Sequence, residues 1–311
     1  MSIGYRANDS PEGWCAELPT RLDLRFAPAG DEGAKLGESP FWDRDDFVWW
    51  VDVTGCGLLR TRLSTRTTQF WPTPETPGFV VLAGPDSPMV GMERGIYAFS
   101  PAHGRFERLV AFAGEGRRFN DATVDHTGRL WASTMAMDAT PGRGELHVVA
   151  PDLTLTSVLT GLTTPNGLAA DMNGDRLFVS DSHPTVQTIW TAACDFATAE
   201  IGARTEFASM RRLAGRPDGA AVAADGACYW IAGVDGGALY GFSTDGRLDY
   251  SVPLPFPAPT KLAFFTGGVA VTAKKEGGYG GELALSTDVP PCLRGAAVPF
   301  WRPGGRSPAA Q

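Results

Sequence analysis

The chain of 311 residues is 43% hydrophobic and carries 27 basic and 35 acidic side chains, which gives a formal net charge of −8. This length allows one large domain or two small ones. The acidic balance, without any run rich in lysine and arginine, argues against a nucleic-acid partner. The 38 glycines and 24 prolines leave little room for long helices.

The N-terminal stretch 1–19 has no basic segment followed by an apolar core, so we expect no signal peptide. No apolar run approaches the roughly 20 residues that span a bilayer. Five cysteines are scattered without a CxxC pair, which predicts reduced, mostly buried thiols and no zinc or redox site. These cysteines are Cys15, Cys56, Cys194, Cys228 and Cys292. We therefore expect a cytoplasmic protein without a membrane partner.

A unit of short apolar runs, separated by turns of Gly, Asp, Asn or Pro, recurs six times. The units begin near Phe41, Val80, Ala122, Leu168, Ala220 and Leu262. Their spacing of roughly 40–50 residues is the period of four-stranded propeller blades, and no stretch keeps a helical period. The sequence predicts an all-β, six-bladed β-propeller over residues 19–301, with an N-terminal extension (1–18) and a C-terminal tail (302–311).

An oxygen-bearing side chain recurs where the innermost strand of a blade should begin. The four side chains are Glu38 in LGESPFW, Asn120 in RFND, Asn166 in PNGLA and Asp218 in RPDG. Taken alone, Asn-Gly predicts a hairpin turn, and Asn166 would then be structural. The turns that enter the innermost strands of a propeller open at one rim of the central channel. We therefore predict that these four side chains converge there.

Two carboxylates and two amides around one axis form an oxygen-only site with about two negative charges. A divalent cation would relieve the repulsion between the carboxylates. No cysteine or histidine occupies an equivalent position, so harder ions are favoured. We expect one divalent cation: Ca²⁺, Mg²⁺, Mn²⁺ or Fe²⁺, with Zn²⁺ as an alternative.

The segments LGESPFW, RFND, PNGLA and RPDG resemble the signature segments of the senescence-marker-protein/gluconolactonase/luciferin-regenerating family, which includes regucalcin. They occur in that family's order, and the resemblance covers roughly residues 30–300. It implies a six-bladed propeller with one divalent metal in the central channel. It also implies that Glu38, Asn166 and Asp218 bind this metal directly.

The same resemblance assigns substrate contacts to Arg118 and Asn120. A third contact is implied at Asp138, where the family often has a glutamate, so the side chain here is one methylene shorter. That difference bears on the sugar that the site would prefer.

We therefore expect a divalent-metal-dependent lactonase that opens a sugar lactone, such as gluconolactone, xylonolactone or arabinolactone, to the aldonic acid. The cation would polarise the lactone carbonyl, and Asp218 would take a proton from the attacking water. Arg118 would hold ring hydroxyls or the tetrahedral oxyanion. No G-x-S-x-G elbow or dinucleotide fingerprint is present, so we expect neither a serine esterase nor an organic cofactor.

Two alternatives stay open. The same metal and carboxylates could hydrolyse phosphotriesters or other esters, or the protein could be a calcium-binding regulator of the regucalcin type. We favour the enzyme because a saturated calcium cage needs more oxygen ligands than this set supplies. We expect a monomer or a weak homo-oligomer.

Four further polar residues lie at or close to the turns of the predicted site. Asp121 should brace its turn. Asp181 and His183 could reach the rim, and Lys261 could project into the channel toward a substrate; the sequence leaves these three roles open.

Overall fold

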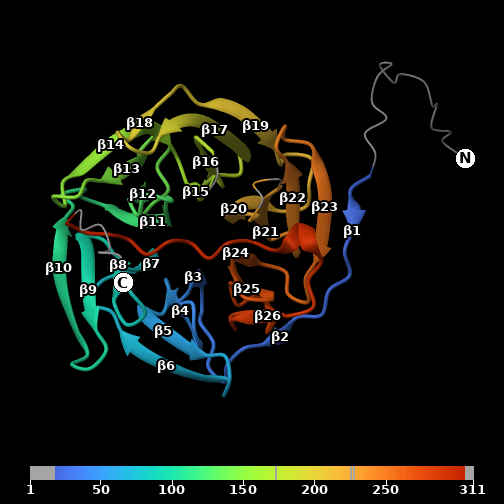
Figure 1. Cartoon of the computed structure of the whole chain (residues 1–311), viewed down its shortest axis with the longest axis horizontal. Helices are drawn as coiled ribbons and strands as arrows, with labels where there is room; N and C mark the ends of the chain where they lie inside the picture. Colours follow the sequence, from blue (N-terminus) through green and yellow to red (C-terminus); the bar gives the residue numbers. More distant parts are fainter. Residues whose placement is uncertain (1–17, 172–173, 225, 227, 305–311) are drawn as a thin grey trace, which may run out of the picture.

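The computed structural model describes residues 18–171, 174–224, 226 and 228–304. Over these residues the chain folds into six antiparallel sheets arranged radially around a central channel (Figure 1). The predicted all-β, six-bladed β-propeller is therefore confirmed. No helix of the described chain is long and apolar enough to cross a membrane.

The first three blades follow the chain in order, each with its innermost strand first. Blade one is β3 (Gly37–Trp42), β4 (Phe47–Asp52), β5 (Gly57–Arg62) and β6 (Thr67–Pro72). Blade two is β7 (Phe79–Leu82), β8 (Pro88–Gly91), β9 (Gly95–Ser100) and β10 (Arg105–Ala111). Blade three is β11 (Arg117–Val124), β12 (Leu130–Ala136), β13 (Gly144–Val149) and β14 (Leu155–Leu162).

The last three blades use the same order, with additions at their outer edges. Blade four is β15 (Pro165–Ala170), β16 (Arg176–Asp181), β17 (Thr188–Asp195), β18 (Glu200–Ile201) and β19 (Thr205–Ser209). Blade five is β20 (Arg216–Val222), β21 (Cys228–Val234), β22 (Ala238–Ser243) and β23 (Leu248–Pro253). Blade six is β24 (Pro259–Phe265), β25 (Gly268–Ala273) and β26 (Ala284–Ser286), and the short 3-10 helix η1 (Pro291–Leu293) follows it.

Segments from the start of the chain complete the last two blades. Strand β2 (Ala27–Pro28) pairs with β26 as the fourth strand of blade six, and β1 (Thr20–Arg21) pairs in parallel with β23 of blade five. Strand β24 also contacts β3, so blades six and one are neighbours. The ring is thus closed by strands from both ends of the chain.

Burial within a blade depends on the distance of the strand from the axis. All seven residues of β12 and of β21 are buried, because neighbouring blades cover both faces of these second strands. The residues of the outer strands β6 and β14 are exposed or partly buried, except Leu162 at the end of β14, which is buried. The hydrophobic core therefore lies around the second strands and not at the outer edge of the blades.

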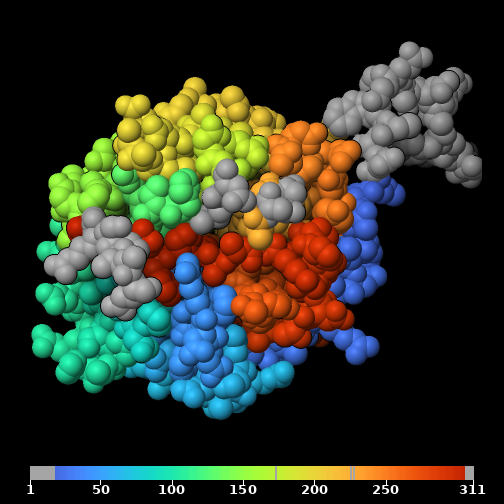
Figure 2. Space-filling view, in the orientation of Figure 1, coloured from blue at the N-terminus to red at the C-terminus, as the bar shows by residue number. Residues whose placement is uncertain are grey.

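The segment after η1 crosses one face of the ring, where Figure 2 shows it as the red band over the centre. The amide of Trp301 donates to Leu82 O at 2.8 Å, that of Arg302 to Gly128 O at 2.8 Å and that of Gly304 to Pro151 O at 2.8 Å. Leu82 ends β7, so this face lies at the ends of the inner strands. Their starts, which carry the predicted site, therefore lie at the opposite rim. The propeller domain was predicted to end at residue 301, but the backbone hydrogen bonds between this segment and the blades continue to Gly304.

The inner strands of all blades except blade two contain a shift in strand register close to their start. Such a shift is a β-bulge, and it changes the direction of side chains that would otherwise point alternately to the two faces of the blade. The shifts fall at Glu38/Phe41, Phe119/Ala122, Asn166/Ala169, Pro217/Ala220 and Pro259/Lys261. The pairing of β7 is continuous and its four residues are apolar. The predicted site residues therefore lie at bulges inside the inner strands. Their placement in the turns that precede these strands was wrong.

We predict that Gly78, which leads into β7, cannot be replaced. A Cβ there would lie 2.1 Å from Phe119 O and 2.9 Å from Asn120 N, so it would push against the backbone of the inner strand of blade three. Gly78→Ala should lower the free energy of unfolding by about 1–3 kcal/mol in urea titrations.

The matched control is Gly84→Ala, because the nearest atom to a Cβ at Gly84 is Ser87 Oγ at 3.7 Å. It should stay within about 0.5 kcal/mol of the parent. Equal stability of the two variants would contradict the close approach.

Candidate metal and substrate site

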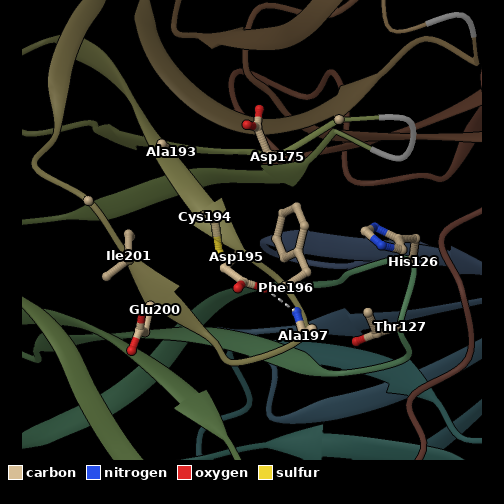
Figure 3. Close-up of a pocket in the computed structure, with 12 residues that line it drawn as sticks. His126, Thr127, Asp175, Ala193, Cys194, Asp195, Phe196, Ala197, Glu200 and Ile201 are labelled. Carbon is tan, nitrogen blue, oxygen red and sulfur yellow. Dashed lines mark hydrogen bonds between the residues drawn. The ribbon is translucent and has the colours of Figure 1, made fainter.

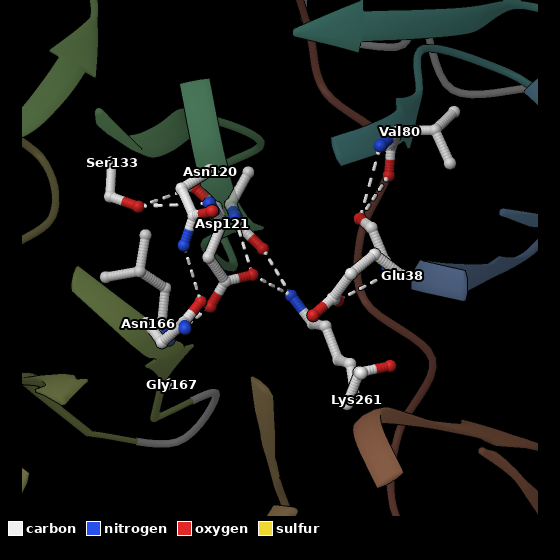
Figure 4. Close-up of polar contacts among 12 residues, drawn as sticks. Glu38, Val80, Asn120, Asp121, Ser133, Asn166, Gly167 and Lys261 are labelled. Atoms are coloured by element: carbon white, nitrogen blue, oxygen red, sulfur yellow. Dashed lines mark hydrogen bonds and ion pairs between the residues drawn. The ribbon is translucent and has the colours of Figure 1, made fainter. Parts of the chain in front are cut away.

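The bulges bring side chains of separate blades together at the mouth of the channel (Figure 4). Asn120 Nδ2, from β11, donates to Asn166 Oδ1 at 2.8 Å and to Pro165 O at 3.0 Å, both on β15. The two predicted amides therefore touch across the junction of blades three and four. Among the described residues, none donates a hydrogen bond to Asn120 Oδ1, so this oxygen is available to a ligand.

A serine that the sequence analysis missed continues this chain of contacts. Asn166 Nδ2 donates to Ser182 Oγ at 2.7 Å, and Ser182 Oγ donates to Pro217 O at 2.5 Å. Pro217 precedes Asp218 on β20, so blades three, four and five are joined side by side at the rim. Ser182 lies between Asp181 and His183, which the sequence did single out, but serine in such a turn carries no distinct signal.

Gly167 explains the Asn-Gly pair, which is not a hairpin turn. It has φ +60° inside the bulge of β15, and a Cβ there would lie 2.6 Å from both Tyr229 Oη and Ser180 Oγ. Buried Tyr229 donates from Oη to Gly167 O at 2.8 Å. Glycine is therefore required both by the left-handed backbone and by the lack of space, and the bulge directs Asn166 into the channel.

Glu38, from β3, lies in an environment that disfavours its charge. Burial, and then the negative charge of Asp121, raise its pKa to about 8, while the charges of Lys261 and Arg118 act in the opposite direction. Ser39, which has φ 54°, donates its amide to Glu38 Oε2 at 2.9 Å. A partly buried, desolvated carboxylate with a single hydrogen bond from the backbone would be stabilised in its charged form by a nearby cation.

Asp218 shares this environment. Burial raises its pKa well above the usual value, followed in size by the negative charges of Glu38 and Asp121. Arg216 opposes the shift, but its guanidinium Nη2 is paired with Asp235 Oδ2 at 2.5 Å. Asp218 is therefore a buried carboxylate that is repelled by the partly buried Glu38.

The donor set fits one divalent cation with a preference for oxygen ligands. Glu38 and Asp218 supply two negative charges, and Asn166 supplies a neutral oxygen. Among the described residues, no three His, Cys, Asp or Glu side chains form a metal-binding group, so a cation here would depend on the amide as a third protein ligand. The three predicted metal ligands remain a prediction.

Arg118 also lies within electrostatic reach of both carboxylates. Burial lowers its pKa, against the charges of Glu38, Glu93 and Asp218. Its Nη1 donates to Phe119 O at 2.8 Å, and its Nη2 contacts Met135 Sδ at 3.5 Å. No ion pair within 4.0 Å joins Arg118 to a carboxylate of the described chain, which leaves its remaining donors for a ligand.

Two other residues singled out in the sequence, Asp138 and Asp181, bind backbone amides. Asp138 follows β12, is exposed, and accepts the amide of Thr140 at 3.0 Å. Asp181 is buried and accepts the amides of Thr163 and His183 at 2.7 and 3.0 Å. Asp181 therefore braces the backbone, and the role of Asp138 as a substrate contact stays a prediction.

Lys261 projects into the channel, as predicted, but its partner is Asp121. Its Nζ donates to Asp121 Oδ1 and, at 2.9 Å, to Ala122 O. Asp121 was predicted to brace its turn; it lies instead inside β11, where its Oδ1 accepts the amide of Ala122 and its Oδ2 the amide of Leu168 on β15, both at 2.8 Å. The ammonium group is therefore occupied by protein atoms.

A second hollow, of about 700 Å³, lies between blades three and four near the opposite rim (Figure 3). His126, Asp175, Cys194 and Glu200 are among its lining residues. Burial raises the pKa of the Cys194 thiol to about 12, so it stays protonated and is a poor nucleophile. The hollow therefore lacks the reactive centre that the channel mouth offers.

The fold and the site define a six-bladed propeller with an acidic, oxygen-lined site at one end of its channel. The family described as the SMP-30/Gluconolactonase/LRE-like region matches residues 36–273. This match covers more than half of the chain, which belongs to that family.

Relatives at modest identity bear names of sugar lactonases and of regucalcin. The chain is 32% identical to 6-deoxy-6-sulfogluconolactonase of Pseudomonas putida over 80% of this chain and 87% of the relative. It is 28% identical to pentonolactonase XacC of Haloferax volcanii, over 75% and 79%. It is 25% identical to regucalcin of Gallus gallus, over 78% and 83%.

Solved structures confirm the architecture. A calcium-binding protein, regucalcin, from Agrobacterium tumefaciens superposes with a TM-score of 0.84 over 92% of this chain and 100% of the other, at 20% identity. A luciferin-regenerating enzyme superposes with a TM-score of 0.79 over 86% and 96%, at 23% identity. At these identities the likeness establishes the fold.

The raised pKa of Glu38 predicts how stability depends on pH when a chelator is present. A carboxyl group whose pKa rises on folding stabilises the fold below its unfolded value of 4.5, and this contribution is lost as the pH rises through about 8. The free energy of unfolding should fall between pH 5 and 8.5, by on the order of a few kcal/mol.

Glu38→Gln should make this decrease shallower and leave the variant more stable than the parent at pH 8.5. The control Glu107→Gln removes a charge from the exposed side of β10 and should keep the slope of the parent. Urea titrations across this pH range measure both slopes, and identical slopes for Glu38→Gln and the parent would rule out a charged, buried Glu38.

Proposed function

We propose that this protein is a divalent-metal-dependent lactonase that opens a sugar lactone to the aldonic acid. The observation that carries the proposal is a pair of desolvated carboxylates, the partly buried Glu38 and the buried Asp218, beside an arginine that has no ion-pair partner among the described residues. The names of the relatives, a sulfogluconolactonase and a pentonolactonase, support the same class of substrate.

Glu38, Asn166 and Asp218 would hold the cation. When bound, it would supply positive charge to the carbonyl oxygen of the lactone and make a water molecule more acidic. Ca²⁺, Mg²⁺, Mn²⁺, Fe²⁺ and Zn²⁺ all tolerate two carboxylates and one amide, so the add-back experiment below is designed to choose among them.

Asp218 would act as the general base. It takes a proton from water as the water oxygen bonds to the lactone carbonyl carbon. The bond between that carbon and the ring oxygen then breaks, and the departing alkoxide receives the proton, which gives the hydroxy acid. A carboxylate that takes a proton from water and returns it to the leaving group in this way acts first as general base and then as general acid.

Arg118 and Asn120 would position the substrate. The guanidinium of Arg118 can donate paired hydrogen bonds to a ring hydroxyl or to the oxyanion, and Asn120 Oδ1 can accept one from a hydroxyl. Asp138, exposed at the same rim, would contact a more distant hydroxyl. These contacts favour a polyhydroxylated lactone over an unsubstituted one.

Two other functions remain to be tested on the same site. Hydrolysis of phosphotriesters or other esters would use the same carboxylates but would gain nothing from substrate hydroxyls. A calcium-binding regulator would bind Ca²⁺ without turnover, and the name regucalcin among the relatives is the reason to include it.

The test measures ring opening of gluconolactone, xylonolactone and arabinolactone after chelation and after each of the five cations is returned. We expect activity to disappear on chelation and to return with at least one cation. Removing hydroxyls from the lactone should lower kcat/KM. No metal-dependent turnover of any lactone would overturn the proposal.

Asp218→Asn should lower kcat by at least about 100-fold, the usual contribution of a general base, with the circular dichroism spectrum unchanged. The control Asp152→Asn, in an exposed turn of blade three, should keep the activity of the parent. Tight Ca²⁺ binding without turnover in the parent protein would favour the regulator instead.

A further inference from the structure

A buried ion pair crosses the channel from one side of the ring to the other. Lys261 lies on β24 of blade six and its partner Asp121 on β11 of blade three, and in a ring of six these blades are opposite. The side chains are only 8% and 3% exposed. A pair buried this deeply is costly to desolvate, and apolar residues would often serve stability as well or better. Stability alone is therefore a weak reason for this pair.

The pair reaches three inner strands. Lys261 Nζ also donates to Ala122 O of β11 at 2.9 Å, and Asp121 Oδ2 accepts the amide of Leu168 on β15 at 2.8 Å. Leu168 is two residues from Asn166, inside the bulge that turns the amide into the channel. The pair thereby fixes β15 against β11 and β24 immediately below the site.

The stem of Lys261 also lies against the strand that carries the second carboxylate. A Cβ at Gly219 of β20 would lie 2.4 Å from both Cβ and Cγ of Lys261. Gly219 follows Asp218, so the position of this strand depends on where the lysine stem passes. Figure 4 shows the ammonium of Lys261 between Asp121 and Glu38.

We propose that Lys261 is a positioning residue: paired with Asp121 across the channel, it holds the inner strands at the spacing that lets Asn166 and Asp218 bind one cation. This inference rests on the proposed function, because it concerns the same cation site. It adds a residue that lies 140 positions from its partner in the chain and touches neither substrate nor cation.

The decisive variant is the double substitution Lys261→Met with Asp121→Asn. Methionine keeps the length of the stem, asparagine can still accept the amide of Leu168, and the formal charge of the pair stays at zero. The total charge near the site is then unchanged, and the decisive signal is a loss of cation affinity together with a loss of kcat/KM in a protein that still unfolds cooperatively. The single variants leave one charge buried without its partner and serve only to show that the two residues are coupled.

The measurement is Mn²⁺ affinity, from the free-ion signal in electron paramagnetic resonance, together with thermal unfolding and lactone kinetics. We expect the double variant to unfold cooperatively, with Mn²⁺ bound at least tenfold more weakly and kcat/KM reduced at least tenfold. The control Lys275→Met removes an exposed lysine near the same rim and should change neither value by more than twofold.

Mn²⁺ affinity of the double variant within twofold of the parent would overturn the proposal, and so would a parent protein that binds no Mn²⁺. If the double variant does not fold, Lys261→Arg carries the test with the same thresholds, because its planar fork keeps the charge but cannot repeat the contacts of the ammonium. A parent that binds Mn²⁺ but hydrolyses no lactone would refute the proposed function alone, and the affinity comparison would still decide the role of Lys261.

Discussion

The repulsion among carboxylates in a confined space governs the mouth of this propeller. Glu38 and Asp218 come from blades one and five; desolvation and the charge of Asp121 raise the pKa of both, and the charge of Glu38 raises that of Asp218 further. The nearby cations relieve this only in part: Lys261 is paired with Asp121 and Arg216 with Asp235, and the pKa values stay raised despite the opposing charges of Lys261, Arg118 and Arg216. A bound divalent cation would keep both carboxylates ionised, and this joins the structure to the proposed chemistry.

The arrangement depends on bulges rather than on loops. In a regular strand the side chains alternate between the two faces of the blade, and none points down the channel axis. Bulges break this alternation at Glu38, Asn166 and Asp218, whereas the inner strand of blade two pairs regularly and is apolar. With the C-terminal segment across the opposite face, the polar mouth is at the end where the inner strands begin.

Much of this architecture could be predicted from the sequence. The spacing of the six apolar units gave the blade number, because each unit forms its hairpins from local turn signals and short apolar runs. The recurrence of Glu38, Asn120, Asn166 and Asp218 indicated one rim. The prediction placed these residues in turns because Asn-Gly is normally a hairpin signal. A glycine with positive φ is equally suited to a β-bulge, so the sequence could not show whether Gly167 lies in a hairpin turn or in a bulge.

The sequence by itself thus determined the fold class, the number of blades and the four inner strands that carry an oxygen-bearing side chain at a bulge near their start. The tertiary structure decided what surrounds them: Ser182 linking Asn166 to the next blade, Tyr229 fixing the bulge, and Lys261 reaching Asp121 across the channel. Periodicity reports contacts between residues that are close along the chain. Contacts over 140 residues exist only once the ring has closed and brought opposite blades together.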